Sequence, residues 1–193
     1  MQFKGRHVSE TIKTSFPKSA KIGGLAVVTS VIIGLGLGII SALKSDRWPD
    51  RLCMFISTLG ITIPSFVISA LLIYIFASKM RILPTTGLDN WKSYIMPVIA
   101  LAGSSTAFIT RLTRNKLIDV MKSDYIRTAK AKGLSKRTVI FKHALKNSII
   151  PVVTYLGPLV AGILTGSFVV EKIFSIPGLG KEFVSNVNTR DYS

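Results

Sequence analysis

Cysteine, histidine and acidic residues are scarce in this sequence of 193 residues, which holds one cysteine, two histidines and nine aspartates and glutamates. The single cysteine, Cys53, supports neither a disulfide framework nor a metal cluster, and its place in an apolar run predicts a packing role. A Walker-type Gly-x-x-x-x-Gly-Lys-Ser/Thr pattern is also missing, so we expect no ATP hydrolysis by this chain. His143 has no acid, nucleophile or metal partner at useful spacing. The sequence therefore predicts no catalytic residue, no cofactor and no metal site.

Residues 1–21 contain no apolar core and no small-residue cleavage site, so we do not expect them to act as a signal peptide. Basic residues are abundant: 25 Lys and Arg give a formal charge of +16, together with 48% hydrophobic residues. Charge alone would suggest nucleic-acid binding, but no RNA- or DNA-binding motif accompanies it. The mean hydropathy of +0.46 is high, and the basic residues lie between long apolar runs. That arrangement is typical of helical membrane proteins.

Four apolar stretches are long enough to cross a membrane, at residues 22–43, 52–78, 95–113 and 148–170. A helix rises about 1.5 Å per residue, so about 20 residues cross a hydrocarbon core of about 30 Å. We therefore predict an all-α fold, a polytopic bundle of transmembrane helices within one domain. No acidic residue lies in these four stretches, which argues against the proton relay of a secondary transporter.

Glycine and proline residues predict how these helices pack. Gly34, Gly36 and Gly38 stand at alternate positions of the first span, where they favour close approach of a neighbouring helix. The third span is rich in small residues and is expected to be buried in the bundle. Pro64 lies in the middle of the second span and predicts a kink, and Pro151 is a further structural or kink position.

The connection at 114–147 is dense in Lys and Arg, and only Asp119 and Asp124 offset them. Such a connection is difficult to translocate, so we place it in the cytoplasm. With four spans, both ends of the chain then lie outside, as extracytoplasmic segments 1–21 and 171–193.

The same connection is patterned. Leu117, Met121, Tyr125 and Ala129 recur at a four-residue step, which predicts one apolar stripe on a basic helix. Gly133 is expected to cap that helix, and Ser135 is expected to cap a second one, which contains Val139, Ile140, Ala144 and Leu145. The result is a helix–Gly–helix element outside the membrane, with an apolar face available for a partner. From these residues alone, docking on a protein and resting on anionic lipid both stay open.

The sequence resembles the inner-membrane permeases of oligopeptide, dipeptide and nickel ABC importers. The tract from Asp124 to Leu134, the stretch from His143 to Asn147 and the following Pro151 look like the coupling loop of that family. Glu171 to Gly180, followed by Arg190, Asp191 and Tyr192, is a second similar segment. The segments from His7 to Pro17 and from Ile63 to Phe66 are also family-like. Arg127, Thr128 and Ala129 replace the Glu-Ala-Ala of other importers, which favours the peptide branch.

The resemblance implies six spans of the type I ABC importer kind, so residues 1–193 look like the central part of a permease without its first and last transmembrane helices. It also implies that the loop at 114–147 couples the permease to cytoplasmic ATPases. The implied coupling residues are Asp124, Tyr125, Arg127, Thr128, Ala129, Lys130, Gly133, Leu134, Ser135, His143, Ala144, Leu145 and Asn147. Pro177, Gly178 and Gly180 are implied structural positions.

The implied partners are a second, homologous permease subunit in a heterodimer, the cytoplasmic ABC ATPases, an extracytoplasmic solute-binding protein and the lipid membrane. The implied location is the bacterial or archaeal cell membrane, and the implied function is transport of peptides, nickel or related small solutes. The alternative is a secondary transporter, or another helical membrane protein, with a basic loop that binds the lipid surface. Nucleic acid is not an expected partner.

Overall fold

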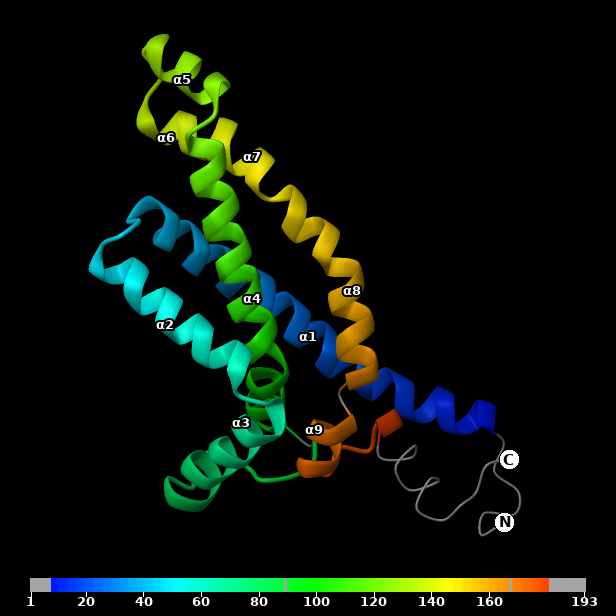
Figure 1. Ribbon diagram of the computed structural model, residues 1–193. Coiled ribbons are helices and arrows are strands. Elements are labelled where there is room, and N and C mark those ends of the chain that lie inside the picture. The colour runs from blue at the N-terminus through cyan, green and yellow to red at the C-terminus, as the bar shows by residue number, and fades with distance from the viewer. Residues whose placement is uncertain (1–7, 89, 167, 181–193) are drawn as a thin grey trace. The chain divides into compact units, whose positions relative to one another are not determined.

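The computed structural model describes residues 8–88, 90–166 and 168–180, and these residues form helices, turns and connections but no strand (Figure 1). Within them, Ile12–Leu43, Trp91–Met121 and Ile150–Ile173 are long and apolar enough to cross a membrane. A bent pair, Trp48–Thr62 with Ser65–Lys79, adds one more if it is counted as a single span. The predicted all-α membrane fold is confirmed, with three or four candidate spans.

Helix α1 (Val8–Leu43) begins well before the apolar stretch at 22–43. Its early turns carry exposed Lys13 and Lys18 beside buried Ser15 and Ser19. Hydropathy identifies the part of a helix that prefers lipid, whereas lysine and glutamate are good helix formers in water as well. The helix therefore continues through a polar stretch that hydropathy alone assigns to a segment outside the membrane.

The stretch at 52–78 is two helices, and not the single kinked helix that its hydropathy predicts. Helix α2 (Trp48–Thr62) ends before Pro64, and α3 (Ser65–Leu72) begins after it and continues into the π-helical η1 (Ile73–Lys79). Pro64 has φ −61° and ψ 145°, an extended conformation, and it lacks the N–H that a continuous helix needs. Proline also disfavours helical backbone at the residue before it, here Ile63.

The rest of the described chain consists of one long helix and a series of shorter ones. They are η2 (Trp91–Tyr94), α4 (Ile95–Met121), α5 (Asp124–Ala131), α6 (Lys136–Thr138), η3 (Val139–Ala144), α7 (Leu145–Ser148), α8 (Ile150–Gly166) and α9 (Phe168–Ile173). Helix α4 extends past the span end predicted at residue 113. Pro151 does not kink a helix, because it lies in the first turn of α8, where its missing N–H leaves no bond unmade.

One compact unit comprises Met1–Val28, Ile63–Gly103 and Val160–Ser193. In it, α3 packs against α9. Helices α1 and α8 approach closely at Gly23, where an added methyl would lie 3.1 Å from the Ile163 side chain. The Lys21 ammonium donates a hydrogen bond to the Tyr94 hydroxyl at 3.2 Å and lies 4.5 Å from the centre of that ring. A tyrosine held in this way is common at the level of lipid headgroups.

A second compact unit comprises Thr29–Thr62 and Ser104–Leu159. In it, α1 packs against α4, where Gly34 and Gly38 are buried against Ile109 and Thr113. The close packing predicted for the glycine string is confirmed at these two positions, whereas Gly36 faces open space with nothing within 4 Å. The rings of Phe108 on α4 and Tyr155 on α8 have their centres 4.5 Å apart. The predicted burial of the small residues of the third span holds for Ala100, Ala102, Ser105 and Ala107, whereas Ser104 is exposed.

Candidate functional site

Helices α5, α6, η3 and α7, with the turn at Gly133, form the segment 124–148, which we call the coupling element. Figure 1 shows α5 and α6 beyond the C-terminal end of α4, and α7 leading into α8. All of it belongs to the second unit.

Helix α4 stops at Met121, and a turn at Lys122 and Ser123 separates it from α5. The Ser123 hydroxyl donates to the Val120 carbonyl at 2.6 Å, and the Ser123 N–H bonds the same carbonyl at 3.0 Å, so the serine ends α4 rather than capping α5. The prediction of one continuous stripe from Leu117 to Ala129 is therefore wrong. After the turn the buried side of α5 moves by one residue, so that Ile126 is fully buried and Tyr125 is 42% exposed.

A small apolar core holds the coupling element against the rest of the second unit. Its buried members are Leu117 of α4, Ile126 and Ala129 of α5, and Val139 and Ala144 of η3. Ile39 and Ala42 of α1, with Val120 and Met121 of α4, pack around them. Full burial of a side chain such as Ile126 contributes about 1.5–3 kcal/mol. The apolar face that the sequence left for a partner is thus covered within this chain.

The turn between the two helices of the coupling element has the predicted chemistry. Gly133 has φ +75°, its N–H bonds the Lys130 carbonyl at 3.0 Å, and the Leu134 N–H bonds the Ala129 carbonyl at 3.3 Å. This pair of bonds is a Schellman motif, which favours glycine because a Cβ is disfavoured at positive φ. Ser135 then caps the next helix by accepting a hydrogen bond from the Thr138 N–H at 3.3 Å. Both predicted caps are confirmed.

The face of the coupling element that points away from its core is polar and basic, with a few apolar side chains. Asp124, Arg127, Thr128, Lys130 and Lys132 are exposed, as are Leu134 and Phe141. The Asn147 amide donates to the Tyr125 hydroxyl at 2.8 Å and ties α7 to α5. Arg127 and Asp124 lie 3.6 Å apart, but exposed pairs of this kind contribute little to stability.

The other implied coupling residues fall into two groups. Ala129 and Ala144 belong to the core of the coupling element. His143 and Leu145 are half-buried on the second helix, and Ser135 serves as its cap.

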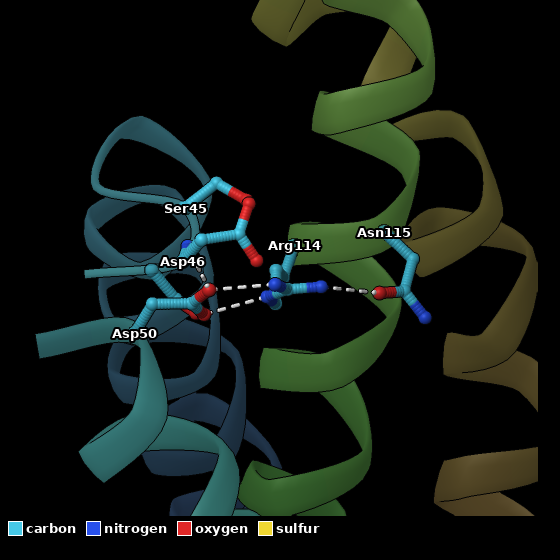
Figure 2. A network of polar contacts seen from close by, with 6 residues as sticks. Ser45, Asp46, Asp50, Arg114 and Asn115 are labelled. Carbon is cyan, nitrogen blue, oxygen red and sulfur yellow. Dashed lines mark hydrogen bonds and ion pairs between the residues drawn. The ribbon is translucent and has the colours of Figure 1, made fainter. Parts of the chain in front are cut away.

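A partly buried ion pair, with side chains 19% exposed at Arg114 and 3% exposed at Asp50, lies near the same end of α4 and was not predicted from the sequence. Arg114 reaches from α4 to Asp50 on the first turn of α2, as Figure 2 shows, and its Nε and Nη2 each lie 2.6 Å from one carboxylate oxygen. The Asp46 N–H donates to the same carboxylate at 2.8 Å, and the Ser41 hydroxyl of α1 donates to it as well. Asp50 is only 2% exposed. The two charges lie 64 residues apart in sequence, so no local pattern announces the pair.

Pro177, Gly178 and Gly180 lie in the first unit, in the connection that follows α9. The buried Glu171 carboxylate accepts a hydrogen bond from the Gly180 N–H at 2.8 Å, and Ser19 of α1 accepts one from the Leu179 N–H at 2.9 Å. A methyl group at Gly180 would lie 2.5 Å from the Cα of Phe168, and Pro177 is exposed. The glycines therefore permit close approach to α1 and α9. His7, Arg190, Asp191 and Tyr192 lie outside the described residues.

The sequence matches one known family along most of its length. Residues 34–193 match the binding-protein-dependent transport system inner membrane component family, and this chain belongs to that family. It is a family of multi-pass transport proteins of the inner membrane and not of enzymes.

The relatives include peptide permeases of several bacteria. The dipeptide transport system permease protein of Bacillus subtilis is 48% identical over 96% of this chain and 60% of its own length. The oligopeptide transport system permease protein of Salmonella typhimurium is 44% identical over 100% of this chain and 63% of its own length. The glutathione transport system permease protein of Escherichia coli is 43% identical over 97% of this chain and 61% of its own length. The chain thus spans about three-fifths of the length of these curated relatives.

A crystal structure of an amino acid ABC transporter with histidines has the same fold. The TM-score is 0.72 and the sequence identity 19%, over 95% of this chain and 81% of the other. This comparison supports the fold alone.

Proposed function

We propose that this chain forms the membrane-embedded path of an ABC importer for short peptides and transmits the work of cytoplasmic ATPases through the coupling element. The relatives named above are permeases for dipeptides, oligopeptides and glutathione, all of which are peptides. The implied partners are two ATPases, a second permease subunit and an extracytoplasmic solute-binding protein.

One observation carries the proposal: the coupling element is a pre-formed body with its own core, and it presents a polar, basic face. Ile126 and Ala129 pack α5 against the rest of the second unit, and the capped turn at Gly133 sets the angle between the two helices. An element built in this way moves as a unit when a partner pulls on it, which is how a closing ATPase pair would reorient the spans. A loop that only rested on lipid would instead direct its apolar side toward the membrane.

Cysteine crosslinking in the assembled importer tests the docking. With Cys53 replaced by serine, single cysteines are placed at Thr128, Leu134 and Ala129, and a short bifunctional maleimide is added. We expect Thr128→Cys and Leu134→Cys to crosslink to the ATPase, because both positions are exposed. Ala129→Cys is the matched control on the same helix, and it should not react because Ala129 is 6% exposed within the core.

The outcomes separate the two interpretations of the loop. Absence of any ATPase crosslink from Thr128→Cys and Leu134→Cys would contradict the proposal. If a water-soluble maleimide also failed to label these two cysteines in membranes stripped of ATPases, the face would be lying on lipid.

A further inference from the structure

The Asp50 carboxylate is fully occupied. It accepts two hydrogen bonds from the Arg114 guanidinium, one from the Asp46 N–H and one from the Ser41 hydroxyl. A carboxylate offers about four lone-pair directions, so this set leaves little room for another donor. A fork-shaped guanidinium bound in this two-point manner also fixes orientation as well as distance.

The four hydrogen bonds come from three residues, which lie in three different parts of the second unit. Ser41 lies near the end of α1, Asp46 lies in the connection to α2 with an unusual φ of 63°, and Arg114 lies on α4. Asp50 itself lies in the first turn of α2. One side chain therefore holds the end of α1, the connection and the start of α2 against a single point of α4.

That point adjoins the coupling element. Leu117, one turn after Arg114 on α4, is a buried member of the coupling-element core. Ile39 and Ala42, on either side of Ser41 on α1, pack against the same core. Helices α1 and α4 thus contact the coupling element directly. Among the described residues, helix α2 contributes none to that core, and the Asp50–Arg114 ion pair attaches it to α4 beside the core.

We propose that the Asp50–Arg114 pair is the clamp that carries movement of the coupling element to helix α2, an inference that rests on the proposed function. Burying a charge pair is a poor route to stability, because desolvation offsets most of the attraction. An apolar contact would allow the helices to slide, whereas a two-point ion pair with all its partners in place holds one register. Asp50 and Arg114 are positioning residues in this scheme, and they touch neither peptide nor nucleotide.

The clamp makes a specific prediction about coupling. Without it, the ATPases still dock and still hydrolyse ATP, but α2 no longer follows the coupling element. In proteoliposomes that contain the assembled importer and its binding protein, Asp50→Asn should lower the peptide taken up per ATP hydrolysed by roughly tenfold or more. Arg114→Lys keeps the charge and loses the second contact, so it should show a smaller loss of the same kind.

Arg111→Gln is the matched control. Arg111 lies one turn before Arg114 on α4. Within the described part of the chain, its guanidinium donates one hydrogen bond, to the neutral Thr58 hydroxyl of α2 at 2.8 Å, and this contact is exposed. Its uptake per ATP should stay within about twofold of the starting protein.

The amount of assembled complex and the ATPase crosslink of Leu134→Cys are measured for every variant. A lower uptake per ATP with the crosslink retained supports the clamp. An unchanged amount of peptide taken up per ATP overturns the proposal. A smaller amount of assembled complex that still transports the normal amount of peptide per ATP also overturns it, because the ion pair would then contribute to folding only. If Asp50→Asn does not assemble, Arg114→Lys decides between the same outcomes. If Leu134→Cys fails to crosslink in the starting protein, the proposed docking fails, and the clamp fails with it.

Discussion

The contact between α1 and α4 offers a sharp test, because one helix carries two glycines of opposite environment. Gly38→Ala would place a methyl carbon 2.6 Å from the Cβ of Thr113 and 2.8 Å from the backbone oxygen of Thr110. Carbon atoms in good contact lie about 3.5–4.0 Å apart, so the helices would have to separate by about 1 Å. Overpacking of this kind costs about 1–3 kcal/mol. Backbone atoms of α4 cannot swing aside as a long side chain can.

Gly36→Ala is the control within the same turn, since nothing lies within 4 Å of its added methyl. Both substitutions gain about 1 kcal/mol of helix propensity, so the difference between them isolates the packing cost. We expect Gly38→Ala to be less stable than Gly36→Ala by about 1–3 kcal/mol, or several degrees in Tm. The assay is thermal unfolding of the purified permease in detergent. Equal stability of the two variants would refute close packing of α1 on α4 at Gly38.

Two further predictions concern glycines outside this contact. Gly133→Val should lower peptide uptake and the ATPase crosslink of Leu134→Cys. A non-glycine residue costs about 1–2 kcal/mol in the left-handed region, and a β-branched residue costs more. Gly133→Asn is the control and should keep both uptake and crosslink, because asparagine tolerates that region. Normal uptake by Gly133→Val would show that the angle of the turn is unimportant. Gly180→Ala should destabilise the permease more than Gly178→Ala, as measured by thermal unfolding. At Gly180 the added methyl would lie 2.5 Å from a backbone atom, the Cα of Phe168, whereas at Gly178 the three nearest atoms belong to the side chains of Glu171 and Ser19. The reverse order would contradict the packing described for this connection.

Features that depend on a few neighbouring residues could be predicted from the sequence. The Schellman turn at Gly133 and the cap at Ser135 are closed by bonds that reach no more than five residues, so the local pattern contains all the participants. The long apolar stretches likewise identify the membrane helices, since their transfer into lipid depends on composition.

Features that depend on distant partners could not be predicted in the same way. The amphipathic pattern around Ile126 shows that one side of α5 is buried, but not that α1, α4 and η3 of the same chain cover it. The break at Ser123 moved the buried side by one residue, and no glycine or proline marks that position. Asp50 and Arg114 are ordinary charges beside apolar stretches until folding brings them together across 64 residues.

The internal core of the coupling element also has a thermodynamic consequence for assembly. Because Leu117, Ile126 and Val139 are already packed against one another, the polar face is ordered before any partner arrives. Association then loses little conformational entropy, and most of the binding free energy is available for affinity rather than for folding. If the ATPases dock on this face as proposed, the heat-capacity change on binding should be small, because the apolar core of the coupling element is already buried in the free permease.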